Sequence, residues 1–131
     1  MKKQGILHPG IAEVVASMGH TDMLVIADAG LPIPPDVRRL DLALAAGMPP
    51  FLQTVQVLLG ELQVQEAIIA EEMVTRSPAI YQQLRELLGD IPMTQMPHEV
   101  FKQKTSAAKG IVRTGEFTPY ANVILISGVT F

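Results

Sequence analysis

Apolar residues recur along this chain with two different periods, and the two periods separate predicted helices from predicted strands. Helical spacing, with apolar residues at i, i+3, i+4 and i+7, is found in three segments: residues 9–18, 51–62 and 80–88. Proline precedes or opens the first two segments, and glycine follows the first and the third, as is typical of helix ends. We therefore expect three amphipathic helices, with one or two further helical turns at residues 98–104.

Continuous apolar runs indicate strands that are buried on both faces. Three such runs occur, at residues 23–27, 110–112 and 123–126, and residues 66–70, which begin with a glutamate, are predicted to form a fourth strand. Residues 37–42 and 91–96 are weaker strand candidates, because charged residues interrupt the first and a proline interrupts the second. Since strands and helices alternate, the pattern predicts an α/β layered domain with helices on both faces of a sheet. No repeat, low-complexity tract or linker divides the chain, so we expect residues 1–131 to form a single domain.

The composition of the chain is unusually poor in charge. Hydrophobic residues make up 48% of the sequence and charged residues only 18%, against roughly 25% charged residues in ordinary soluble domains. A surface this short of charge indicates that part of it is covered, so we expect a homo-oligomer. The net charge is -3 and no basic run is present, which argues against nucleic acid and anionic membranes as partners.

Cysteine is absent from the sequence, which excludes disulfides, thiol catalysis and cysteine-ligated zinc. The basic N-terminus lacks the apolar run of a signal peptide. Residues 42–60 carry no charge, but glycine, proline and glutamine interrupt them, so we do not expect a transmembrane helix. A cytoplasmic location is the expectation that fits these features.

The loop at residues 113–122, between the last two predicted strands, is richer in functional groups than a plain connection needs. It holds a cation, an anion, two aromatic rings, a hydroxyl and an amide: Arg113, Glu116, Phe117, Tyr120, Thr118 and Asn122. Gly115, with its permissive backbone angles, and Pro119, with its fixed φ, should define the path of the loop. Such a loop suits a polyhydroxylated ligand. Two alternatives stay open: the charged residues pair with each other, and the aromatic rings cap an edge of the core.

Three polar residues lie at the ends of predicted strands, where ligands of α/β sheets gather. His20 immediately precedes residues 23–27, Asp28 follows the opposite end of that strand, and His98 follows the weak strand at residues 91–96. An imidazole of ordinary pKa, about 6.5, can give and take protons at neutral pH. Each residue alone fits a capping, turn or surface role as well, and spacing does not join the three into one site. No motif predicts a metal, a phosphate-binding loop or a nucleophile elbow.

The sequence resembles the D-ribose pyranase family, part of the wider ribose and fucose mutarotase group. Three motifs carry the resemblance: residues 3–7, residues 19–32 with Gly-His-Thr-Asp and Ala-Asp-Ala-Gly-Leu-Pro, and residues 113–122. The resemblance implies a three-layer α/β/α sandwich, and with six predicted strands we expect a mixed, mostly parallel central sheet. It also implies a homodecamer of two pentameric rings, with the active site close to the boundary between neighbouring subunits.

The resemblance also implies an activity and a set of site residues. Members of the family interconvert the pyranose and furanose forms of D-ribose through the open chain, without a cofactor or metal. Carried over by position, His20 is the expected proton donor. The expected sugar-binding residues are Asp28, His98, Tyr120, Ala121 and Asn122. Where the family usually has Asn after Gly-Ile-Leu, this chain has His8, and because His8 precedes a helix we expect the change to alter capping rather than chemistry.

Ring opening of a cyclic hemiacetal requires loss of the anomeric hydroxyl proton and delivery of a proton to the ring oxygen, which general acid–base groups can supply. The sequence therefore predicts an isomerase. One alternative is a non-catalytic sugar-binding or regulatory module of ribose uptake, which would use the same pocket without proton transfer. Another is a mutarotase that acts on fucose or a different sugar by the same chemistry.

Overall fold

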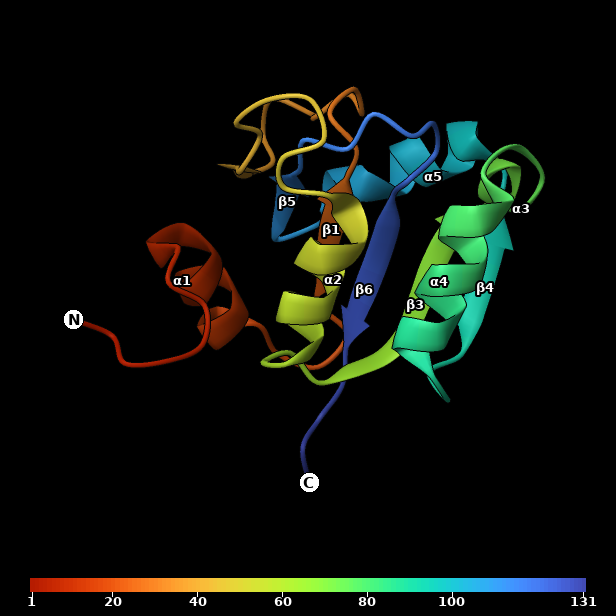
Figure 1. Ribbon diagram of the computed structural model, residues 1–131. Helices are drawn as coiled ribbons and strands as arrows, with labels where there is room; N and C mark the ends of the chain where they lie inside the picture. Colours follow the sequence, from red (N-terminus) through yellow and green to blue (C-terminus); the bar gives the residue numbers. More distant parts are fainter.

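Six strands form one central sheet in the computed structural model of the chain, which describes residues 1–131 (Figure 1). In chain order they are β1 (Met23–Ala27), β2 (Arg39–Asp41), β3 (Val64–Ala70), β4 (Met93–Met96), β5 (Gly110–Arg113) and β6 (Val123–Ser127). Across the sheet the order is β2-β5-β1-β6-β3-β4. Only β6 runs antiparallel to its neighbours, β1 and β3, whereas the other pairs are parallel. The expected mixed, mostly parallel sheet is confirmed.

Helices cover both faces of this sheet. They are α1 (Pro9–Ser17), α2 (Phe51–Leu59), α3 (Glu71–Arg76), α4 (Pro78–Leu88) and α5 (His98–Lys104), which continues into the short 3-10 turn η1 (Thr105–Ala107). In Figure 1, α2 and α4 lie in front of the sheet and α5 lies behind it. The fold therefore has three layers, as expected, with the heavier helical layer on the α2 and α4 side.

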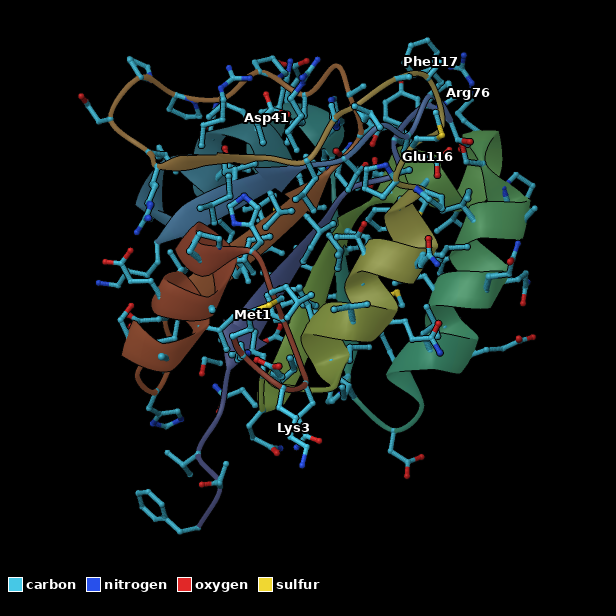
Figure 2. All side chains as sticks on the ribbon, turned by 60° about the vertical axis from the view of Figure 1, so that its left-hand side comes forward. Met1, Lys3, Asp41, Arg76, Glu116 and Phe117 are labelled. Atoms are coloured by element: carbon cyan, nitrogen blue, oxygen red, sulfur yellow. The ribbon has the colours of Figure 1, made fainter.

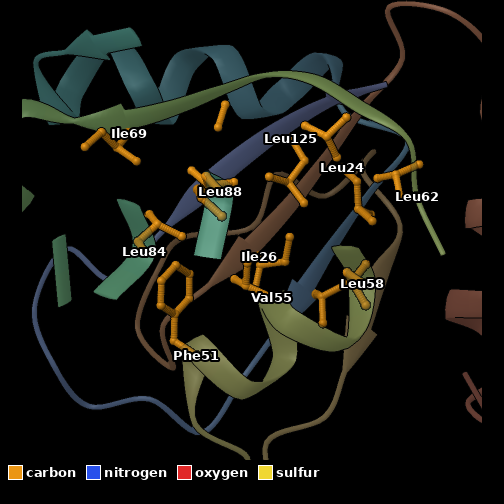
Figure 3. Packing of buried hydrophobic residues seen from close by; sticks show 14 of the residues in the cluster. Leu24, Ile26, Phe51, Val55, Leu58, Leu62, Ile69, Leu84, Leu88 and Leu125 are labelled. Carbon is orange, nitrogen blue, oxygen red and sulfur yellow. The ribbon is translucent and has the colours of Figure 1, made fainter. Parts of the chain in front are cut away.

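The two apolar cores on the two faces of the sheet explain the continuous apolar run of β1. Successive side chains of a strand point to opposite faces. Leu24 and Ile26 accordingly belong to the larger core under α2 and α4 (Figure 3), whereas Val25 and Ala27 belong to the smaller core with Phe101 of α5. These four residues are fully buried, and Met23, the first residue of the strand, is partly buried. A strand that is packed on both faces has no place for a polar residue.

The polar loops gather at one end of the sheet because of the strand directions. The carboxyl ends of the five parallel strands lie at one edge, and the antiparallel β6 brings its amino end to the same edge. Asp41, Glu116 and Phe117 lie at this end in Figure 2, whereas Lys3 lies toward the other end. The C-terminal tail also leaves the molecule at that other end (Figure 1). The two edges are called the carboxyl edge and the amino edge below.

His8 caps α1, as its position before a predicted helix led us to expect. Its ring Nδ1 accepts a hydrogen bond of 3.2 Å from the backbone N–H of Ile11, and Pro9 occupies the first helical position. An N-cap side chain satisfies one of the donors that the first turn of a helix leaves free.

The helix α3 was not predicted from the sequence. It has six residues and buries one side chain, Met73, so it is too short to display a helical period. The element bounds also shift: the predicted helix at residues 51–62 ends at Leu59, and the predicted strand at residues 37–42 shortens to three residues.

No helix is both long and apolar enough to cross a membrane.

Candidate active site

The carboxyl edge brings together five of the six residues expected in the site. Asp28 directly follows β1, His98 begins α5 after β4, and the run Tyr120 to Asn122 leads into β6. Sequence spacing did not join these residues, because they lie on three segments as many as 94 positions apart. Parallel pairing of β3 with β4 and antiparallel pairing of β6 with β1 and β3 join them.

Asp28 and Asn122 form a reciprocal pair. Asn122 Nδ2 donates to Asp28 Oδ2 at 2.9 Å, and the Asp28 backbone N–H donates to Asn122 Oδ1 at 2.8 Å. The second carboxylate oxygen of Asp28 accepts from the Gly30 N–H at 2.9 Å. Asn122 is fully buried. Its amide therefore orients the carboxylate of Asp28, which is itself partly exposed and able to accept hydrogen bonds from a ligand.

His98 and Tyr120 form the second half of the carboxyl-edge cluster. Their ring centroids are 5.0 Å apart and the rings are nearly perpendicular, at 88°. Neither ring nitrogen of His98 has a hydrogen-bond partner within the chain, although Nδ1 is buried. Tyr120 has a left-handed backbone with φ of 62°, which turns the chain sharply into β6. The side chain of Ala121 is buried in the larger core, so only its backbone is available to a ligand.

Helix α3 supports both aromatic residues of this cluster. Glu72 accepts the backbone N–H of His98 with both carboxylate oxygens, at 2.9 and 3.2 Å. At the other end of α3, the Arg76 guanidinium carbon lies 5.9 Å from the Tyr120 ring centroid. The partner of Glu72 is a backbone N–H 26 residues away, and such a contact leaves no sequence signal.

The charged residues of the loop at residues 113–122 do not pair with each other. Arg113 Nη1 donates to both carboxylate oxygens of Asp41, at 3.1 and 3.2 Å, and Arg113 Nε donates to the Ala29 carbonyl at 3.1 Å. Glu116 accepts from the Phe51 N–H at 3.0 Å, at the start of α2, and from the Thr118 hydroxyl at 2.8 Å. The loop is thus fastened to β2, to α2 and to the loop after β1.

Burial and hydrogen bonding act on the pKa of Glu116 in opposite directions. Partial burial raises the pKa of its carboxyl group, but hydrogen bonds from the Phe51 N–H and from Thr118 lower it. These bonds outweigh the desolvation, so the pKa of Glu116 lies below its ordinary value. The carboxylate is therefore held ionised at neutral pH, where it caps α2.

Gly115 is needed in this loop for space rather than for unusual backbone angles. A Cβ atom at this position would lie 2.3 Å from the Met48 carbonyl oxygen and 2.5 Å from the Ala45 carbonyl oxygen. Its φ lies outside the left-handed region, so the sequence-based reason was wrong. The close approach is what lets residues 42–50 pack against the loop.

A polar cavity of about 380 Å³ opens beside Asp28, under the loop. Its walls include Asp28, Gly30, Arg113, Glu116, Phe117 and Thr118. Phe117 is 70% exposed at the rim, so it does not cap the core. Carboxylate oxygens with an aromatic rim suit a small polyhydroxylated ligand.

His20 does not lie with the other candidate residues. It precedes β1 at the amino edge, where its ring is exposed and its Nε2 lies 2.9 Å from Gln65 Oε1. A five-residue strand separates it from Asp28, a span of about 16 Å at 3.3 Å per residue. One monosaccharide cannot contact both residues of the same chain.

Comparison with known proteins gives a match over nearly the whole chain. The model of the RbsD / FucU transport protein family matches residues 1–130. The D-ribose pyranase of Chloroflexus aggregans is 53% identical over 131 residues, which is 100% of both chains. The D-ribose pyranase of Geobacillus thermodenitrificans is 50% identical over 100% of this chain and 99% of its own length.

Solved structures agree with these matches. The structure of Bacillus subtilis RbsD complexed with D-ribose matches with a TM-score of 0.97 at 46% identity, covering 100% of each chain. The structure of the fucose mutarotase from Streptococcus pneumoniae, in complex with L-fucose, matches with a TM-score of 0.78. It is 24% identical and covers 94% of each chain, so this second likeness concerns the fold alone.

Proposed function

The chain belongs to the RbsD / FucU transport protein family, and on that premise we propose that it is a D-ribose pyranase. It is an isomerase that interconverts the pyranose and furanose forms of D-ribose by ring opening and closure. The observation that carries this function is the identity of about half of all positions, over the full length, with D-ribose pyranases. The likeness to RbsD complexed with D-ribose supports the same substrate.

In the proposed mechanism, general acid–base catalysis opens the sugar ring. The bond between the anomeric carbon and the ring oxygen breaks, and the anomeric hydroxyl loses its proton to a water molecule as the carbonyl of the open chain forms. His20 donates a proton to the ring oxygen that leaves. Closure onto a different hydroxyl reverses these transfers and yields the other ring form. A positioned acid or base of this kind typically contributes on the order of 10² to 10⁴ in rate.

The carboxyl-edge residues bind the sugar in this proposal. The Asp28 carboxylate, oriented by Asn122, accepts hydrogen bonds from sugar hydroxyls. The ring nitrogens of His98 are free of partners in the chain and can bond a hydroxyl, while Tyr120 contributes its hydroxyl or its ring face. Ala121 takes part through its backbone, because its side chain is buried.

The proposed site requires two copies of the chain. His20 and the carboxyl-edge residues belong to opposite edges of the sheet, so a sugar bound by Asp28 can meet a proton donor only from a neighbouring subunit. The proposed assembly is a homodecamer of two pentameric rings, and the low charge content supports extensive subunit contacts. A cytoplasmic role in ribose catabolism completes the proposal and stays a prediction.

Exchange spectroscopy by NMR tests the proposed function. At equilibrium, purified protein should speed up exchange between the pyranose and furanose signals of D-ribose relative to the uncatalysed rate. His20→Gln should remove this acceleration while ribose binding, measured by calorimetry, persists. A folded oligomer that binds ribose without accelerating exchange would contradict the isomerase and favour a sugar-binding module of ribose uptake. Faster exchange with L-fucose than with ribose would favour the alternative mutarotase.

A further inference from the structure

Gln65 is the one side chain that contacts the ring of His20 by a hydrogen bond. Its Oε1 lies 2.9 Å from His20 Nε2, and the other ring nitrogen of His20, Nδ1, has no partner in the chain. The two residues come from segments 45 positions apart, the loop before β1 and the start of β3. The contact is therefore produced by the fold and not by the local chain.

An irregularity in the sheet directs Gln65 toward His20. The pairing of β3 with β6 changes register between Val64 and Glu66, so Gln65 occupies a β-bulge. Bulges of this kind turn a side chain away from the regular alternation and are frequent beside active sites. Gly128, which directly follows β6, leaves room for Gln65, since a Cβ atom there would lie 3.1 Å from Gln65 Cβ.

The backbone next to His20 is held to the same part of β6. The Thr21 N–H donates to the Ser127 carbonyl at 2.9 Å, and the Ser127 N–H donates to the Asp22 carbonyl at 2.8 Å. His20 lines a hollow of about 490 Å³ between the end of α1 and the C-terminal tail, whereas Gln65 is not among the residues of its wall. A ligand in this hollow would contact His20 directly, whereas Gln65 lies outside the wall of the hollow.

We propose that Gln65 is a positioning residue for the general acid–base His20, a role that rests on the proposed function. The Gln65 carbonyl accepts the Nε2–H of His20 in both the neutral and the protonated imidazole, because Nε2 carries a proton in both states. Nδ1 is then the nitrogen that gives up and regains the proton during ring opening and closure. An amide N–H donated to Nε2 would be lost whenever that nitrogen became protonated, so the carbonyl orientation is the one that survives the catalytic cycle.

The other charged groups near His20 have partners of their own. Asp22 accepts from the Gly19 N–H and lies 3.8 Å from the Lys109 ammonium. Glu61 accepts from the Ile6 N–H and lies 3.6 Å from Lys2. Glu61 is the one charged side chain in the wall of the hollow. No hydrogen bond or ion pair joins any of these groups to the imidazole, which leaves Gln65 as the group able to act on it directly.

Titration of the His20 ring by NMR tests the contact independently of activity. The chain has three histidines, so His20→Gln assigns the signal of His20. Gln65→Glu places a carboxylate against Nε2 and should raise the titration midpoint of His20 by about one pH unit. The matched control is Gln56→Glu, which makes the same charge change on an exposed position of α2 and should leave the midpoint unchanged. An unchanged midpoint in Gln65→Glu would overturn the proposal.

Kinetics of the folded oligomer test the consequence for the reaction. Gln65→Leu removes the acceptor and should lower the turnover of pyranose–furanose exchange roughly tenfold. This loss is smaller than the whole contribution of a positioned acid, because His20 itself is kept. The KM for ribose should change less than twofold, because Gln65 does not touch the sugar. Unchanged turnover in Gln65→Leu would also overturn the proposal. A different pair of results would refute the proposed donor role of His20 instead. In that case exchange would persist in His20→Gln, while the titration midpoint of His20 would still shift in Gln65→Glu.

Discussion

His20→Gln and His98→Gln lie at opposite edges of the sheet, and each should remove most of the exchange activity. An oligomer that contains both variants should nevertheless regain part of the activity. The reason is geometric. The two residues lie at opposite ends of strands that run in the same direction, and five residues of β1 span about 16 Å. If one sugar is bound between two copies, one copy supplies His20 and the other supplies His98.

The expected size of the recovery follows from this arrangement. In an oligomer assembled at random from equal amounts of the two variants, each half of a shared site is intact with a chance of about one half, so about a quarter of the sites are fully intact. Both substitutions spare the apolar cores, since neither histidine belongs to them. Loss of folding should therefore not obscure the result.

The assay is NMR exchange of D-ribose at a concentration well below saturation, where weaker binding at His98→Gln also lowers the rate. The two variants are co-expressed with different affinity tags, and mixed oligomers are isolated by sequential purification. The control replaces the second variant by the double variant, which supplies no intact His20 and should restore nothing. Mixed oligomers as inactive as the separate variants would refute the shared site.

Three further predictions concern the parts that support the site. Glu72→Ala should raise the ribose KM several-fold with little change in turnover, because it frees the N-terminus of α5 at His98, and Glu72→Gln, which keeps an acceptor, should recover most of the affinity. Gly115→Ala should destabilise the fold by about 3 kcal/mol in urea unfolding, whereas Gly30→Ala, whose Cβ would have no contact closer than 3.7 Å, should be nearly neutral. Because the pKa of Glu116 is lowered in the fold, its contribution to stability is present above its unfolded-state pKa and is lost as pH falls through the folded value. Glu116→Gln should therefore flatten the fall in unfolding free energy below about pH 4.5, and an equally steep acid limb in that variant would contradict the linkage.

The sequence predicted a set of candidate site residues, five of which the fold brings to one edge of the sheet, but it did not predict the contacts among them. Asp28 and Asn122 were both expected to bind the sugar, yet the amide of Asn122 is buried and faces Asp28 across 94 positions of the chain. Glu72 was not among the expected site residues, because the backbone N–H of His98 that it binds has no side-chain signature. Gln65 gave no signal at all, since a β-bulge depends on the partner strand.

Local features of the chain were determined by the sequence itself. The apolar run of β1 predicted a strand buried on both faces, and proline and glycine marked helix ends, because burial period and capping depend on residues within a few positions of one another. The same local order placed His20 and Asp28 at opposite ends of one strand. Only the tertiary structure decided which end the other site residues would join. That outcome depends on the parallel direction of β4 and the antiparallel direction of β6, and strand pairing is set by packing between segments far apart in the chain.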